Sequence, residues 1–196
     1  PGTGKSAVSA VIANELVGDF TVMFVEAQAG ARLLTAVVEE AQHLAPALIV
    51  LEDVDLWCRD RDSGGSAGLS ELSAAMDIRP SARILTLAST NDVSTLDKAA
   101  IRTGRFDSIV EVGYPSRTDS ARILAALLAE VPGGAEVDAT AVASVLPERT
   151  SGSDLREIVR RAVLADGAGV VSTATLLAEV GSGRYRAVVP SAGMYL

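Results

Sequence analysis

The chain opens on the sequence PGTGKS, which constrains the fold more than any other part of its 196 residues. A Gly-rich turn that ends in Gly-Lys-Ser lets backbone N–H groups converge, because glycine tolerates positive φ angles. Good helix formers with apolar spacing follow, so a helix is expected over residues 4–17. The N-terminus of that helix adds partial positive charge at the same point. The opening therefore predicts a phosphate-binding loop.

Apolar runs alternate with helical patterns up to residue 115. The runs that predict strands cover residues 20–25, 48–51, 83–88 and 106–112. The helical patterns cover residues 30–44, 69–77 and 96–101, and a polar Gly/Ser-rich loop covers 59–68. Such alternation predicts an α/β fold, in which helices cover both faces of a parallel sheet. Ligands of these sheets bind at the carboxyl ends of the strands.

After residue 115 the pattern changes to helices alone, at residues 117–130, 138–146, 152–166 and 173–180. We therefore predict an α/β domain over residues 1–115, an all-helical subdomain over 116–183 and a tail over 184–196. The full phosphate-loop pattern needs a further glycine five residues before Gly4. A strand normally leads into this loop, so the chain is expected to be a fragment that lacks its first strand.

Composition excludes several classes of protein. There are 25 acidic and 17 basic residues, a net charge of −8, which argues against general binding of nucleic acid or anionic membranes. The single cysteine, Cys58, cannot form an internal disulfide and fits a reducing, cytoplasmic location. The single histidine, His43, excludes any site with two histidine ligands from this chain. No apolar run reaches the roughly 18–20 residues of a membrane span.

Carboxylates directly follow the apolar run at 48–51. Glu52 and Asp53 would lie at the carboxyl end of a buried strand. Beside a phosphate loop, such groups can hold Mg²⁺ and polarise an attacking water. Lys5 would supply a point charge for the outer phosphates, and the Ser6 hydroxyl a ligand for Mg²⁺. The alternative is a solvated strand end with no chemistry.

Three further motifs complete an ordered set. Ser89-Thr90-Asn91 ends the next predicted strand, residues 102–107 read RTGRFD, and residues 151–155 read SGSDL. Together with PGTGKS and Glu52-Asp53, this order resembles the AAA family of ATPases, within the wider AAA+ group of P-loop NTPases. The resemblance covers about residues 1–166. It implies a P-loop α/β sheet followed by a C-terminal helical lid.

The resemblance also implies roles, residue by residue. The nucleotide-binding residues would be Pro1, Gly2, Thr3, Gly4, Lys5, Ser6, Ala7, Gly152 and Ser153. The catalytic residues would be Lys5, Glu52, Asp53, Asn91, Arg102 and Arg105, with Ser6 and Glu52 at Mg²⁺. In the family Asn91 orients the water, while Arg102 and Arg105 match arginine fingers that act on a neighbouring subunit. ATP and Mg²⁺ are thus the expected ligands, and a homo-oligomer, a hexamer in this family, is the expected assembly.

The chain departs from the family pattern at the acidic strand end. The family order is Asp then Glu, whereas here Glu52 takes the metal position and Asp53 the position of the base. Asp is one methylene shorter, so its carboxylate would fall about 1–1.5 Å short, and a misplacement of ~1 Å can cost ~10²-fold in rate. Either hydrolysis is slow, or the strand end is adjusted so that Asp53 still reaches.

A second departure concerns the loop that grips polypeptide in family motors. Residues 25–51 contain no aromatic residue, so Gln28, Ala29 or a second domain would have to take that part. Ser153 also replaces the family's alanine. Two functions therefore remain: an oligomeric ATPase that moves a protein partner, or a nucleotide-regulated scaffold with slow or no hydrolysis. A DNA-acting machine is a third, opposed by the acidic charge.

Overall fold

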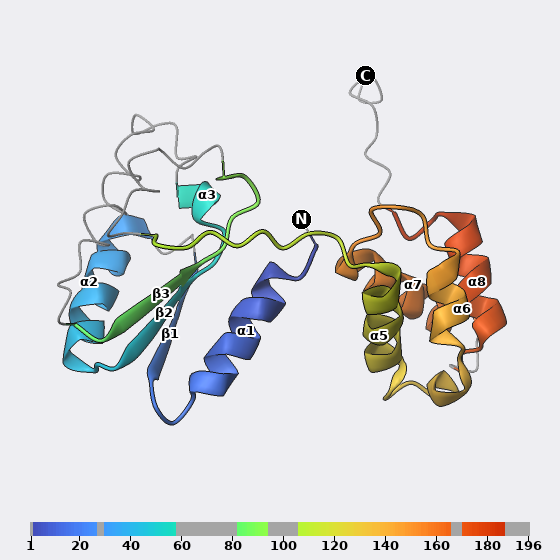
Figure 1. Ribbon diagram of the computed structural model, residues 1–196, viewed down its shortest axis with the longest axis horizontal. Helices are drawn as coiled ribbons and strands as arrows, with labels where there is room; N and C mark the ends of the chain where they lie inside the picture. Colours follow the sequence, from blue (N-terminus) through green and yellow to red (C-terminus); the bar gives the residue numbers. More distant parts are fainter. Residues whose placement is uncertain (1, 27–29, 58–81, 94–105, 166–169, 187–196) are drawn as a thin grey trace, which may run out of the picture. The chain divides into compact units, whose positions relative to one another are not determined.

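The computed structural model describes residues 2–26, 30–57, 82–93, 106–165 and 170–186. The chain forms two compact units, one of Pro1–Gly4 with Val112–Leu196 and one of Lys5–Glu111. We call them the helical unit and the sheet unit (Figure 1). The sheet unit contains α1 (Lys5–Leu16), β1 (Thr21–Val25), α2 (Gly30–His43), β2 (Ala47–Leu51), α3 (Val54–Trp57) and β3 (Ile84–Ala88). The helical unit contains α5 (Arg117–Leu128), the 3₁₀ helix η4 (Gly134–Glu136), α6 (Ala139–Ser144), α7 (Gly152–Ala165) and α8 (Thr173–Ser182).

The strands of the sheet unit form a parallel sheet in the order β1-β2-β3. In its register Leu51 of β2 lies opposite both Val25 of β1 and Ala88 of β3. The three strands therefore end together, and the residues that follow them meet at one edge. This is the edge at which an α/β sheet binds its ligands.

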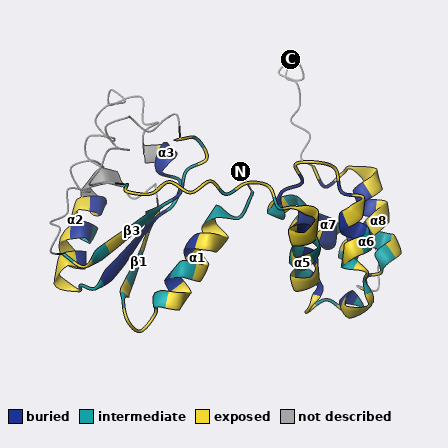
Figure 2. Cartoon of the chain, viewed as in Figure 1, coloured by how far each residue is buried: buried dark blue, intermediate teal, exposed yellow. Residues whose placement is uncertain are grey.

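The central strand β2 is buried on both faces, because a helix covers each (Figures 1 and 2). Its residues point alternately to opposite sides. Ile49 and Leu51 pack with Leu34 and other residues of α2, whereas Leu48 and Val50 pack with Ala13 of α1. All five residues of β2 have no exposed surface, which explains why the run is apolar without interruption.

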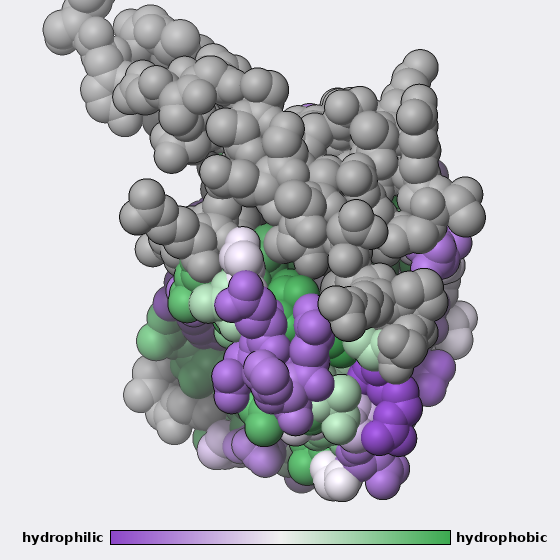
Figure 3. Space-filling view, turned by 90° about the vertical axis from the view of Figure 1, so that its left-hand side faces the viewer, coloured by the Kyte–Doolittle hydropathy of each residue, from purple (hydrophilic) through white to green (hydrophobic). Residues whose placement is uncertain are grey.

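Helix α2 has one apolar face and one polar face. Leu34, Val38 and Ala41 are buried against the sheet, while Glu39 and Glu40 are exposed. Figure 3 looks at the sheet unit from this side and shows hydrophilic residues gathered over it. The apolar stripe at helical spacing thus fixes which face of α2 meets the strands.

The helical unit has a separate core, to which every α-helix of the unit contributes. Leu124 of α5, Leu155 and Ile158 of α7, and Leu176 of α8 have no exposed surface. Polar side chains begin the helices: Ser116 accepts a hydrogen bond from the Asp119 N–H at the start of α5, and Asp138 and Ser172 cap α6 and α8 in the same way. Packing and capping, rather than a sheet, hold this unit together.

The predicted helices at 4–17, 30–44 and 117–130 and those that follow are confirmed to within a few residues, as are the strands at 20–25, 48–51 and 83–88. The strand predicted at 106–112 is wrong: these residues adopt no regular secondary structure. A strand needs a hydrogen-bonded neighbour, and this run pairs with none among the described residues. The helices predicted at 69–77 and 96–101 lie outside the described residues.

The structure adds two short helices, α3 and η4, that the sequence analysis did not predict. In the described ranges, no helix combines the length and the apolar character that crossing a bilayer requires. The subdomain limits at residues 115 and 183 stay predictions.

Candidate nucleotide-binding site

The first turn of α1 directs two side chains toward the ends of β2 and β3. The Lys5 ammonium donates a hydrogen bond to Oδ1 of Asn91 at 2.8 Å. The Ser6 hydroxyl donates to Oε2 of Glu52 at 2.7 Å. Residues 86 and 46 positions apart in the chain are thus brought together by the helix start and the two strand ends.

Glu52 receives hydrogen bonds on one carboxylate oxygen. Ser6 and Ser89 both donate to Oε2, at 2.7 and 2.9 Å. Burial raises the pKa of Glu52, but hydrogen bonds from Ser6, Ser89 and Ser9 and the charge of Lys5 outweigh it, and the pKa lies below its usual value. The side chain is therefore ionised at neutral pH, as a carboxylate must be to bind a metal ion.

Asp53 adopts an unusual backbone conformation, with a φ of 50°. Few residues other than glycine adopt such angles, and Asp is one that tolerates them. The turn brings Oδ1 of Asp53 to 3.1 Å from Nδ2 of Asn91, which donates to it. The Asp53 N–H donates to the Ser89 hydroxyl at 3.3 Å. The backbone is therefore bent at this strand end, and the two hypotheses for the shorter Asp side chain both stay predictions.

Asn91 links Lys5 and Asp53 through hydrogen bonds on either end of its side-chain amide. Its side-chain oxygen accepts from Lys5 and its side-chain nitrogen donates to Asp53, so the order is Lys5–Asn91–Asp53. An amide can do this because it carries an acceptor and a donor on one rigid group. A cation, an amide and a carboxylate thus stand in line at the carboxyl edge of the sheet.

The phosphate loop begins in the helical unit, where Gly2 packs against the start of α7. The carbonyl of Gly2 accepts a hydrogen bond from the Ser153 N–H at 3.1 Å. Gly2 has a φ of 75°, and a Cβ there would lie 2.0 Å from Oγ of Ser153. A Cβ on Gly152 would lie 3.3 Å from the Gly2 carbonyl oxygen. Gly2, Gly152 and Ser153, all predicted to bind nucleotide, therefore do lie together.

The remaining described residues that are predicted to bind nucleotide lie in the turn before α1 or in its first turn. Gly4 has a φ of 108°, Thr3 is half-buried in the same turn, and Ala7 is exposed on α1. Pro1, Arg102 and Arg105 lie outside the described residues. Lys5, Ser6, Glu52, Asp53 and Asn91 come together as a group, although their roles stay predictions.

Three residues without a predicted role hold this group in place: Ser89, Thr90 and Asp55. Ser89 bonds Glu52 and Asp53, and Asp55 bonds the backbone of Asn91 and the hydroxyl of Thr90. Their positions in the sequence could have indicated this part, because each lies within four residues of the end of a predicted strand. Among the described residues, no three His, Cys, Asp or Glu side chains gather as a metal cluster.

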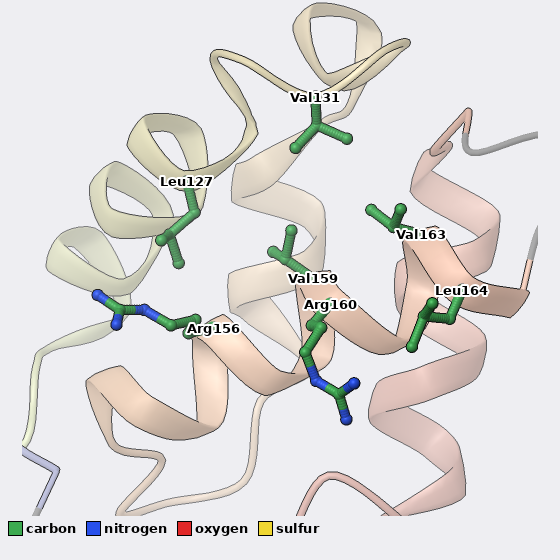
Figure 4. Close-up of a pocket in the computed structure, with 7 residues that line it drawn as sticks. All are labelled: Leu127, Val131, Arg156, Val159, Arg160, Val163 and Leu164. Atoms are coloured by element: carbon green, nitrogen blue, oxygen red, sulfur yellow. The ribbon is translucent and has the colours of Figure 1, made fainter.

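A hollow of about 450 Å³ lies elsewhere, in the helical unit (Figure 4). Its lining comes from α5, the turn that follows it, and α7: Leu127, Val131, Arg156, Val159, Arg160, Val163 and Leu164. None of the predicted site residues is among them.

The sequence of the chain matches that of a known family. The sequence model of the ATPase family associated with various cellular activities (AAA) matches residues 1–114, more than half of the chain. The chain belongs to the AAA family. The match covers every residue of the Lys5–Asn91–Asp53 group and of the Ser6–Glu52 pair.

Similar proteins extend the match into the helical unit. The ATP-dependent zinc metalloprotease FtsH of Cupriavidus metallidurans is 33% identical over 180 residues, and that of Marinobacter nauticus is 34% identical over 183. FtsH 3 of Conexibacter woesei is 33% identical over 180. Each alignment covers 84% of this AAA chain, but only 27%, 28% and 24% of the respective relative. This AAA chain thus spans about a quarter of their length.

Proposed function

We propose that this AAA chain binds ATP together with Mg²⁺ and hydrolyses the terminal phosphoanhydride bond. The observation that carries the proposal is the hydrogen-bonded chain Lys5–Asn91–Asp53 beside the Ser6–Glu52 pair. Phosphate hydrolysis needs a cation for the phosphates, a metal-ligand pair, and a carboxylate with a polar partner to place water. Family membership says independently that such a site is expected here.

Ser6 and Glu52 would hold Mg²⁺. Their oxygens lie 2.7 Å apart, and the lowered pKa of Glu52 keeps its carboxylate charged. Mg²⁺ usually takes few protein ligands and keeps several waters beside phosphate oxygens, which suits a pair better than a cage. When bound, the ion supplies positive charge to the phosphates. Lys5 supplies a second positive charge from the start of α1.

Asp53 and Asn91 would act on the attacking water. The Asp53 carboxylate accepts a proton from the water, while Asn91 fixes the orientation of that water. The water oxygen forms a bond to the terminal phosphorus as the bond from phosphorus to the bridging oxygen breaks, which releases ADP and phosphate. The bend at Asp53 supports this role, because it aims the shorter carboxylate at Asn91.

The finer proposal concerns assembly and work. We propose that Arg102 and Arg105 complete the site of a neighbouring subunit, which requires a homo-oligomer such as a hexamer. The relatives are named as ATP-dependent proteases, and proteases act on polypeptides. We accordingly propose that hydrolysis here moves a protein partner. The single histidine of the chain cannot form a two-histidine zinc site, so no protease activity is assigned to it.

The test is steady-state ATP hydrolysis per subunit as a function of protein concentration, on the full-length protein. Turnover is expected to rise with concentration and to collapse in Arg105→Ala, by about 10³-fold or more, the usual value of an arginine finger. Arg122→Ala is the matched control, because Arg122 is an exposed arginine whose distance to Asp119 is 3.8 Å. A loss in Arg105→Ala equal to that in Arg122→Ala would contradict a shared site.

The scaffold remains the second candidate, and the inverted order Glu52-Asp53 is the observation that favours it. A scaffold binds ATP and changes its oligomeric state without rapid turnover. Tight ATP binding combined with background turnover in both the parent protein and Arg105→Ala would select it.

A further inference from the structure

Asp55 is a buried carboxylate without a place in the reaction described above. Its side chain lies just beyond β2, at the start of α3, and the residue is only 3% exposed. A buried carboxylate is costly unless it receives hydrogen bonds. Its Oδ1 accepts from the Asn91 N–H at 3.2 Å and from the Thr90 hydroxyl at 3.1 Å. Asp55 therefore binds the segment that carries Asn91.

The same region is joined to β3 by the backbone. The Val54 N–H donates to the Ser89 carbonyl at 2.9 Å, and the Asp53 N–H donates to the Ser89 hydroxyl at 3.3 Å. Asp55 adds the next connection along, to Thr90 and Asn91. The segment that carries Asp53 is thus fixed to the segment that carries Asn91 at successive residues.

Thr90 extends this bracing to the far side of Asn91. Its hydroxyl oxygen accepts from the Asp92 N–H at 3.0 Å and contacts Asp55 at 3.1 Å. Asp55 thus contacts Thr90 and Asn91 directly, and it is linked to Asp92 through the Thr90 hydroxyl. The side chain of Asn91 is left to bond Lys5 and Asp53, while its backbone is anchored.

We propose that Asp55 is a positioning residue for ATP hydrolysis, which sets the placement of Asn91 relative to Asp53. This inference rests on the proposed function. It follows from the geometry, because both ends of the Asn91–Asp53 bond lie on segments that Asp55 links. Displacement of a catalytic group by ~1 Å can cost ~10²-fold in rate. Asp55 acts through Asn91 and does not touch the reacting atoms.

Kinetics of three variants test the proposal on the full-length protein. Asp55→Ala should lower kcat by about 10- to 100-fold while KM for ATP changes little. Asp55→Asn keeps the shape of the side chain but loses its charge, so it can still accept hydrogen bonds that are roughly half as strong. Its kcat should therefore fall less than that of Asp55→Ala. In an Asn91→Ala background, Asp55→Ala should cause almost no further loss, since it acts through Asn91. An additive loss in the double variant would overturn the proposal.

Amide hydrogen exchange gives a readout that does not depend on turnover. In Asp55→Asn, exchange of the Asn91 N–H should be at least about tenfold faster than in the parent, because its acceptor is weakened. Exchange of Val50, in the buried central strand, should not change. Equal Asn91 exchange in both proteins would overturn the positioning role. Absent turnover in the parent protein, by contrast, would count against the proposed function itself.

Discussion

The two units use polar side chains in opposite ways. In the sheet unit the central strand β2 is apolar throughout, and carboxylates, hydroxyls and amides gather beyond the ends of β2 and β3, where they bond one another. In the helical unit the polar side chains instead begin helices, as Ser116 and Ser172 do, above a separate apolar core. The same residue types thus build a candidate site in one unit and serve as caps in the other.

Substitutions in the candidate site and in the two cores should therefore have different effects. A site made of half-exposed side chains can be altered without unfolding the sheet, because little apolar surface is lost. A change in the apolar core of either unit should instead lower its stability. Gly2 and Ser153 are the exception in the helical unit, since their contact concerns the phosphate loop.

The largest expected effect on stability is in the core of the helical unit. Leu155→Ala removes a side chain with no exposed surface, and such substitutions cost about 2–5 kcal/mol in the free energy of unfolding. Denaturant unfolding monitored by circular dichroism measures it. Leu164→Ala is the control, because Leu164 lies on the same helix and is 66% exposed. Equal losses in both variants would break the contrast between core and surface in this unit.

A smaller effect is expected at the phosphate loop. In Gly2→Ala the new Cβ would meet Oγ of Ser153 at 2.0 Å, and the φ of 75° disfavours any side chain by about 1–2 kcal/mol. We expect the free loop to relieve this strain by leaving its present conformation, which ATP binding must then restore. Affinity for ATP should therefore fall by roughly tenfold, since 1.4 kcal/mol is a factor of ten. Binding of a fluorescent ATP analogue measures it.

The double variant Gly2→Ala with Ser153→Ala sharpens this result. Once Oγ of Ser153 is removed, the nearest atom to the new Cβ at position 2 is Cβ of residue 153, at 3.1 Å. Part of the ATP affinity should therefore return. The strained φ remains, so recovery should be incomplete. If Gly2→Ala binds as well as the parent, the contact between Gly2 and α7 has no part in ATP binding.

The smallest effect is a pH dependence that should appear in the sheet unit. The pKa of Glu52 is lowered in the folded protein, so its contribution to stability is present above the ordinary glutamate pKa of about 4.3 and is lost as pH falls through the lower folded value. Glu52→Gln should reduce the loss of stability between pH 5 and pH 3, values chosen to span about one unit either side of that pKa. Urea unfolding at both pH values, with the exposed Glu39→Gln as control, measures it.

Much of the fold follows from sequence because its signals are local. The run at 48–51 is apolar because both faces of β2 are covered, and the apolar spacing of α2 follows from one buried face. The strand prediction at 106–112 is wrong because these residues favour strands locally, but a strand also needs a hydrogen-bonded neighbour. Local preference alone does not supply one.

The candidate site could be predicted in part for a similar reason. Motif order predicted that Lys5, Ser6, Glu52 and Asn91 act at one site. The parallel register aligns the ends of β2 and β3, and the first turn of α1 adds Lys5 and Ser6. The bend at Asp53 could not be predicted, because it depends on hydrogen bonds from a different strand end. The part played by Asp55 could not be predicted for the same reason, because its partners lie 35 and 36 residues away.

The role of Asp53 as the base is tested by the rate of ATP hydrolysis in Asp53→Asn and Asp53→Glu beside the unmodified protein, with ATP binding measured in each. If Asp53 is the base, Asp53→Asn should bind ATP normally and lose about 10²-fold or more in kcat. Because the bent strand end already aims the aspartate at Asn91, Asp53→Glu should not exceed the parent rate by a large factor. Turnover in Asp53→Asn equal to that of the parent, or a large gain in Asp53→Glu, would contradict the account.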